Sequence, residues 1–102
     1  MNNQTNQLER VTVFEQWDNE TQAEFKQRVQ TALARGEAEI TFIKSDGSRR
    51  VLRGTTNLNY VPASQQPKGR RPANPEVQPV WDLDKLEWRS FRWDRVADFK
   101  EL

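Results

Sequence analysis

The side chains in this sequence that could do chemistry are carboxylates, amines, guanidinium groups and hydroxyls, because its 102 residues include neither histidine nor cysteine. Without these two residue types the usual nucleophile and base pairs cannot form, and the commonest zinc ligands are missing. The acidic residues Asp82, Asp84 and Glu87 cluster in the sequence, but they lack the glycine-rich loop and the further ligands of a metal site. We therefore expect a non-enzymatic protein with no metal site and no cofactor.

Basic side chains are concentrated in the middle of the chain. Residues 41–71 carry seven basic side chains against Asp46 alone, although the net charge of the whole chain is only +1. Such a segment can bind a polyanion, although the same charges could merely solvate a hairpin and a loop. The residues that we expect to contact phosphates are Arg49, Arg50, Arg53, Lys68, Arg70 and Arg71.

Aromatic and basic residues alternate in the segment EWRSFRWDRVADF, residues 87–99. In a strand, successive side chains point to opposite faces, and we expect Phe91 to face the core with Trp93 near the rim. Trp88 and Arg92 then point toward solvent or toward a covering helix, and an exposed tryptophan beside an arginine can stack on a nucleic-acid base. Trp81, on the neighbouring strand, either extends this stacking surface or belongs to the core.

One helix and several short strands must position these residues. Residues 18–36 have a helical pattern: Asn19 or Thr21 can cap the first turn, and Gly36 can end the helix in the left-handed conformation. Its apolar residues recur at helical spacing and predict one buried stripe, formed by Phe25, Val29, Ala32 and Leu33.

Alternating patterns after the helix predict antiparallel strands. Residues 37–44 and 49–54 form a hairpin through Asp46-Gly47, for which we expect a type I′ turn. A loop without regular structure follows at 57–76, and then strands at 77–83 and 87–93 joined by residues 84–86. A tight helical turn at 94–96 leads to a last strand at 97–101. We expect a polar, partly disordered segment at 1–17 and one domain at 18–102, mainly β with one N-terminal helix.

Two stretches, TFIKSDGSRRVLRGTTNLNYVP and VWDLDKLEWRSFRWDRV, resemble a family of small bacteriophage proteins related to WYL domains. The resemblance covers about residues 37–99 and implies a small, five-stranded, antiparallel barrel of the Sm-like, SH3-like type. WRSFRWDRV is similar to the R-x-F-R-x-D-R-I signature of WYL domains, whose matching positions are Arg89, Phe91, Arg92, Asp94 and Arg95. In WYL regulators this region helps to form a pocket thought to sense nucleic acids or nucleotides. This chain lacks both the Trp-Tyr-Leu triplet and a winged-helix domain.

These observations leave two hypotheses for the function. The first is a module that binds RNA, single-stranded DNA or a nucleotide through the basic residues together with Trp88 and Arg92. The second is a phage protein that binds and modulates a host polymerase, nuclease or defence enzyme, since tryptophan and arginine dominate interface hot spots. An exposed sheet edge also makes a homo-oligomer possible. The lack of cysteine and of a long apolar segment leads us to expect the host cytoplasm and no membrane contact.

Overall fold

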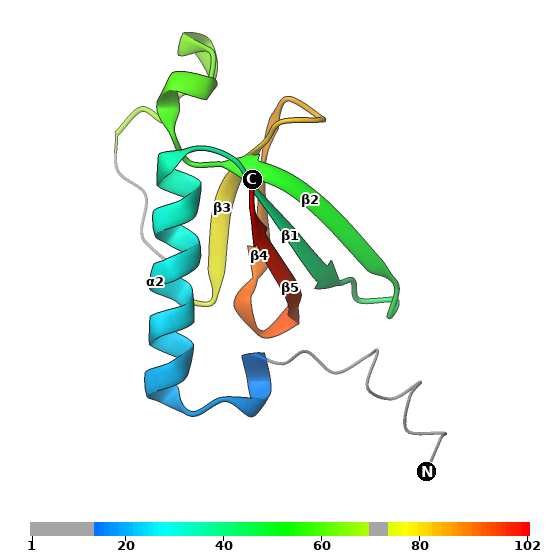
Figure 1. Cartoon of the computed structure of the whole chain (residues 1–102). Helices are drawn as coiled ribbons and strands as arrows, with labels where there is room; N and C mark the ends of the chain where they lie inside the picture. Colours follow the sequence, from blue (N-terminus) through cyan, green and yellow to red (C-terminus); the bar gives the residue numbers. More distant parts are fainter. Residues whose placement is uncertain (1–13, 70–73) are drawn as a thin grey trace.

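A computed structural model describes residues 14–69 and 74–102. A long helix packs on one side of a curved, antiparallel, five-stranded sheet (Figure 1). The helix is α2 (Asn19–Arg35), and the strands lie in the order β4-β3-β2-β1-β5. Their bounds are β1 (Ala38–Ile43), β2 (Arg49–Thr55), β3 (Val77–Asp82), β4 (Glu87–Arg92) and β5 (Val96–Glu101). The described residues also include four short 3₁₀ helices: η1 (Phe14–Gln16), η2 (Leu58–Tyr60), η3 (Ala63–Gln65) and η4 (Trp93–Arg95).

The sheet has the strand count and orientation expected for an Sm-like barrel, but hydrogen bonds do not close it. β2 and β3 pair only at Gly54 with Asp82 and at Thr55 with Trp81, and β4 and β5 remain the two edges. Helix α2 packs against β1, β2 and β5 of this open sheet (Figure 1). Among the described residues, no helix is long and apolar enough to cross a membrane.

The ends of α2 differ in detail from the sequence prediction. Asp18, not Asn19 or Thr21, is the N-cap, and its carboxylate accepts a hydrogen bond of 2.8 Å from the backbone N–H of Thr21. This contact lowers the pKa of Asp18, because it stabilises the charged form. Gly36 does end the helix, but its φ of 175° is extended rather than left-handed. A Cβ atom there would lie 3.3 Å from the Tyr60 hydroxyl oxygen, so close approach favours glycine at this position.

The predicted stripe of α2 forms the centre of the core. Phe25, Val29, Ala32 and Leu33 are all buried and pack with apolar residues of β1, β2, β3 and β4. Trp93 is fully buried in this cluster rather than near the rim, because it contacts Phe25 and Phe14. The core therefore includes Phe14, which precedes the domain start expected at residue 18.

The hairpin between β1 and β2 has a three-residue loop instead of the expected type I′ turn. Only Gly47 has a positive φ, of 88°, and its N–H donates to the carbonyl of Lys44. This geometry is that of a type I turn followed by a left-handed glycine. Asp46 accepts hydrogen bonds from the backbone N–H and the hydroxyl of Ser48, which lower the pKa of Asp46 and favour the negative φ there.

The long loop after β2 is ordered over residues 57–69, contrary to the expectation of no regular element. It contains η2 and η3, which project from one end of the molecule (Figure 1). The start of the loop is held against the end of α2, because the hydroxyl of buried Thr55 donates to the carbonyl of Leu33 at 2.9 Å. The N–H of Thr56 donates to the same carbonyl, so the end of α2 and the end of β2 are joined.

Candidate nucleic-acid interface

The most apolar hollow beside a predicted site residue lies on the outer face of the β3-β4 hairpin. Trp88 on β4 is directly opposite Trp81 on β3, and their ring centroids are 5.6 Å apart. Trp81 is buried, whereas Trp88 is half-buried. Trp88 forms one wall of a hollow of about 550 Å³, whose other wall is the loop after η2. The strand pairing thus places both predicted tryptophans side by side, with Trp88 at a surface and Trp81 buried next to it.

Polar contacts hold the loop wall against the sheet. The indole N–H of Trp88 donates to the backbone carbonyl of Gln65 at 2.6 Å. The side-chain amide of Gln66 donates to the carbonyls of Leu58 and Val61, both at 3.1 Å. These bonds close the segment on itself, so that the hollow is formed before any ligand is present.

The lining of the hollow favours an anionic or neutral ligand. Among the described residues, its lining contains the exposed cation of Lys68, the rings of Pro67, Pro79 and Trp88, and no carboxylate; the remaining lining residues are Ser64, Gln65, Gln66 and Gly69. An aromatic wall next to a cation and several hydrogen-bonding groups can hold a planar ring that carries a phosphate. Lys68 and Trp88 are therefore the two predicted site residues that the fold brings together.

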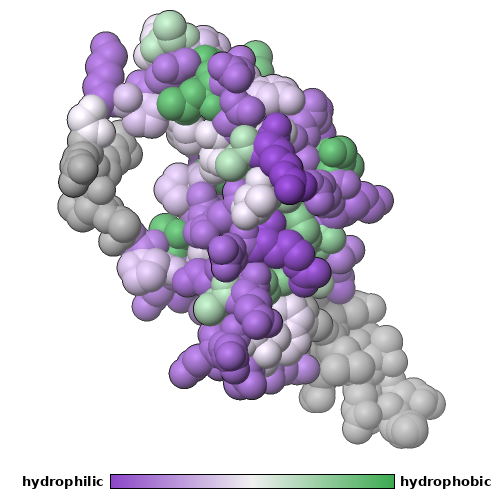
Figure 2. Space-filling model, turned by 60° about the vertical axis from the view of Figure 1, so that its left-hand side comes forward, coloured by the Kyte–Doolittle hydropathy of each residue, from purple (hydrophilic) through white to green (hydrophobic). Residues whose placement is uncertain are grey.

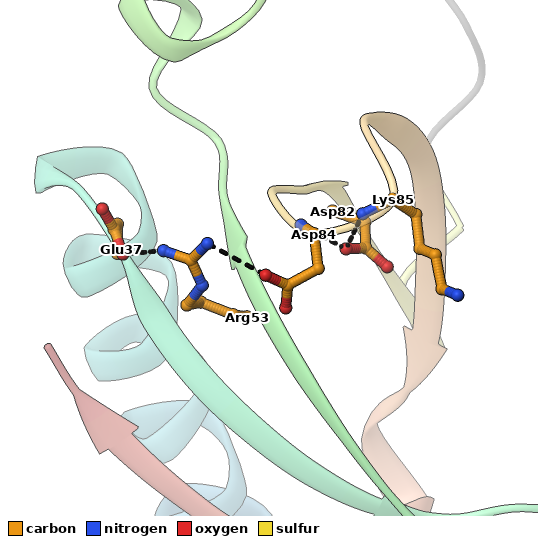
Figure 3. A network of polar contacts seen from close by, with 5 residues as sticks. All are labelled: Glu37, Arg53, Asp82, Asp84 and Lys85. Atoms are coloured by element: carbon orange, nitrogen blue, oxygen red, sulfur yellow. Dashed lines mark hydrogen bonds and ion pairs between the residues drawn. The ribbon is translucent and has the colours of Figure 1, made fainter.

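The three predicted arginines of β2 lie away from this hollow and differ among themselves. Arg49 is exposed, and no ion pair involves it among the described residues. Arg50 turns inward, with its guanidinium 4.0 Å from the carboxylate of Asp82. Arg53 is bound on both sides, by Glu37 at 2.7 Å and by Asp84 at 2.9 Å (Figure 3). The carboxylates of Asp84 and Glu37 raise the pKa of Arg53, because they stabilise its charged form.

The predicted residue Arg92 belongs to a different hollow of about 300 Å³, next to Lys26 and Trp93. Its guanidinium forms two hydrogen bonds of 3.0 Å with the carboxylate of Asp94, and Glu76 lies 3.7 Å away. The bond with Arg92 lowers the pKa of Asp94. Arg92 thus has acidic partners and lines a different hollow from Trp88. Arg70 and Arg71, the remaining predicted residues, lie outside the described residues.

The acidic cluster considered for a metal ion has a structural role instead. Asp82 is buried and accepts hydrogen bonds of 2.9 Å from the backbone N–H groups of Asp84 and Lys85 (Figure 3). Its second oxygen is 3.2 Å from the guanidinium of Arg89, which also pairs with Glu87. Within the described part of the chain, no three acidic side chains are placed to hold a metal ion together.

Sequence reasoning did not identify Gln65, Gln66 and Pro79 as parts of the hollow. The position of Pro79 follows from the β3-β4 register, since Pro79 pairs with Ser90, two residues from the Trp81–Trp88 pair. Predicting that register from the sequence would place Pro79 beside Trp88. No sequence signal indicates that the loop returns to this face.

The fold and the sequence agree with one family of known proteins. Residues 26–97 match the model of the WYL_2 family, which is described as an Sm-like SH3 β-barrel fold. The chain belongs to the WYL_2 family. This WYL_2 protein is also 29% identical over 80 residues to an uncharacterized 11.5 kDa protein encoded in the Gp31-cd intergenic region of Enterobacteria phage T4. The alignment covers 76% of this chain and 78% of the phage T4 protein. No solved structure matches the WYL_2 protein significantly.

Proposed function

We propose that this WYL_2 protein binds single-stranded RNA, single-stranded DNA or a nucleotide, with one base against Trp88 and the adjoining phosphate near Lys68. The observation that supports the proposal most strongly is the hollow itself, whose described lining combines a half-buried indole ring with one cation and no carboxylate. A double helix has no unstacked base to offer, so single strands are the preferred class of ligand.

The half-buried ring of Trp88 and the described basic residues without acidic partners determine which contacts a bound strand can make. The half-buried Trp88 offers one ring, so we expect one stacked base, which contributes about 1 to 3 kcal/mol. Lys68 supplies a phosphate contact, and Arg70 and Arg71 follow it in the sequence after Gly69. Arg53 and Arg92 already have carboxylate partners, so we expect them to contribute little to phosphate binding.

Fluorescence anisotropy with labelled single-stranded RNA, single-stranded DNA and duplex tests the proposal. We expect micromolar affinity for single strands that falls as salt is raised, because each phosphate contact releases counterions. Trp88→Ala should weaken binding about tenfold, which corresponds to roughly 1.4 kcal/mol of lost stacking. Lys68→Glu should weaken binding and flatten its salt dependence.

A charge reversal away from the hollow provides the matched control. Lys85 is exposed on the turn between β3 and β4, and Lys85→Glu should leave the affinity unchanged. Equal losses for Lys68→Glu and Lys85→Glu would show a non-specific charge effect and contradict a defined site. No binding of any strand at low salt would contradict the proposal altogether.

A second candidate function is the binding of a host protein, and exposed apolar residues at one end of the molecule favour it. Hydrophobic residues gather at the end that carries η2 and η3, whereas most of the same face is hydrophilic (Figure 2). Leu58 is 45% exposed and Tyr60 43% exposed there, and Leu102 is 56% exposed. Leu58→Glu should abolish capture of a host protein and leave the binding of nucleic acid unchanged.

A further inference from the structure

The outer edge of β5 is open along a hollow between this strand and α2. Among the described residues, β5 pairs with β1 on one side, and no strand pairs with its other side. The hollow there measures about 380 Å³ and is lined by residues 96–99 of β5, opposite Trp17, Phe25 and Arg28. A β-bulge shifts the register between Asp98 and Val96, so this stretch departs from strict alternation, and its four consecutive residues line the hollow along the edge of the strand.

The register with β1 determines which backbone groups of β5 face this edge. The N–H of Leu102 donates to the carbonyl of Glu37 in the antiparallel ladder. Hydrogen-bonding residues alternate along an antiparallel strand, so the N–H and C=O groups of Phe99 and Glu101 point to the free edge. Asp98 partly blocks this edge, because its carboxylate accepts a hydrogen bond of 2.8 Å from the N–H of Phe99.

We propose that a second copy of this chain pairs with this edge, β5 against β5, in an antiparallel two-fold arrangement centred on Phe99. In this register Asp98 of each copy lies directly opposite Lys100 of the other copy, and both side chains are exposed in the single chain. The pairing therefore forms two cross-strand pairs of opposite charge. Such pairs stabilise antiparallel strands, and like charges at the same positions destabilise them.

The alternation of charge along β5 selects this register over its neighbours. Centring the pair on Asp98 would place two aspartates opposite each other, and centring it on Lys100 would do the same with two lysines. Charged residues on an edge strand usually prevent pairing with another chain. Here the charges prevent the wrong registers and favour one.

The same arrangement exchanges local contacts for contacts between copies. The N–H of Phe99 loses the Asp98 carboxylate but gains the carbonyl of Phe99 in the second copy. The ring of Phe99 is only partly buried beside Phe25, so the second copy can cover it. Arg28 lines the hollow without an ion-pair partner among the described residues, and Glu101 of the second copy would come opposite Ala97, in that same hollow.

Charge reversal at the two positions, followed by sedimentation velocity, tests the proposal. Asp98→Lys places lysines opposite lysines in a homodimer, and Lys100→Asp places aspartates opposite aspartates. Each variant alone should dimerise at least tenfold more weakly than the wild type. An equimolar mixture of the two variants restores both opposite-charge pairs, so it should form a heterodimer as readily as the wild type forms its homodimer.

A control variant at a distant position separates the effect of pairing from the effect of net charge. Lys85→Asp changes the net charge as Lys100→Asp does, but at a distant turn, and should not affect dimerisation. Circular dichroism confirms that each variant folds. A wild-type chain that sediments as a 12.0 kDa monomer at all concentrations would overturn the proposal. Variants that dimerise like the wild type, or a mixture that remains monomeric, would also overturn it.

Discussion

Asp82 connects parts of the sheet that are distant in the sequence. Its buried carboxylate binds two backbone N–H groups of the β3-β4 turn and faces the guanidinium groups of Arg50 and Arg89. The turn that it supports includes Leu86, whose φ of 58° is unusual for a residue other than glycine. The Asp82 side chain thus links the β3-β4 turn, next to Trp88, to Arg50 on β2 and Arg89 on β4.

Replacing Asp82 should therefore be costly. We expect Asp82→Ala to lower the free energy of unfolding by about 3 kcal/mol, because it leaves Arg50 and two backbone amides without their partner and leaves Arg89 with Glu87 alone. Asp82→Asn should cost less, since its amide oxygen still accepts from the turn. Urea denaturation measures both, with Asp84→Ala as the matched loss of an exposed carboxylate. Equal effects of Asp82→Ala and Asp84→Ala would contradict the structural role of Asp82.

A carboxylate that binds an arginine also gives the protein a defined response to acid. Arg92 lowers the pKa of Asp94 below its ordinary value of 3.8, so the unfolded chain takes up this proton at a higher pH than the folded chain. The stabilisation is complete above pH 3.8 and is lost as the pH falls through the lower, folded pKa. We expect Asp94→Asn to unfold with a weaker dependence on pH between about 4 and 2. An unchanged acid dependence, followed by circular dichroism, would contradict this assignment.

At the scale of elements, the loop of residues 57–69 is the element on which the candidate site depends. The amide of Gln66 closes it by donating to the carbonyls of Leu58 and Val61. We expect Gln66→Ala to loosen the loop and to expose Trp88, while the cost to global stability remains small. Quenching of tryptophan emission by acrylamide should rise in this variant but not in Gln66→Ala combined with Trp88→Phe. Unchanged quenching would mean that other contacts hold the loop.

The approach of β2 to β3 is the second critical feature at this scale. A Cβ atom on Gly54 would lie 3.1 Å from the carbonyl oxygen of Trp81 and 3.2 Å from the Cβ atom of Val80. These two strands share only two paired positions, so a shift that makes room for the Cβ atom would disturb the whole pairing between them. Gly54→Ala should lower the free energy of unfolding by about 1 to 3 kcal/mol. Thermal unfolding measures this loss, and a variant as stable as the wild type would show that the strands can separate.

At the scale of the whole molecule, periodic patterns predicted the fold better than they predicted the site. The helix, all five strands and the four apolar residues of α2 follow from hydrophobic spacing, because burial of one face dominates both kinds of element. The N-cap, the conformation of Gly36 and the turn at Gly47 were predicted wrongly. Several residues can satisfy each of those local geometries, and side-chain contacts decide among them.

The candidate site could be predicted only in part, since it depends on contacts between distant segments. Clustered basic residues suggested one surface, but acidic partners from the α2-β1 connection, the β3-β4 turn and η4 pair with Arg53 and Arg92. A basic residue in the sequence is therefore not always free to bind an anionic ligand. Trp88 and Lys68 come together only because the loop folds back over the hairpin, and no sequence pattern encodes that return.

The most direct test of the proposed function is the nuclear magnetic resonance signal of the indole N–H groups during titration with a short single-stranded oligonucleotide. The chain has four tryptophans, and Trp88→Phe identifies the signal of Trp88. We predict that the Trp88 signal moves most, because its ring lines the hollow, while the signal of buried Trp81 moves less. An oligonucleotide that binds without moving the Trp88 signal, or that does not bind, would contradict the proposed site.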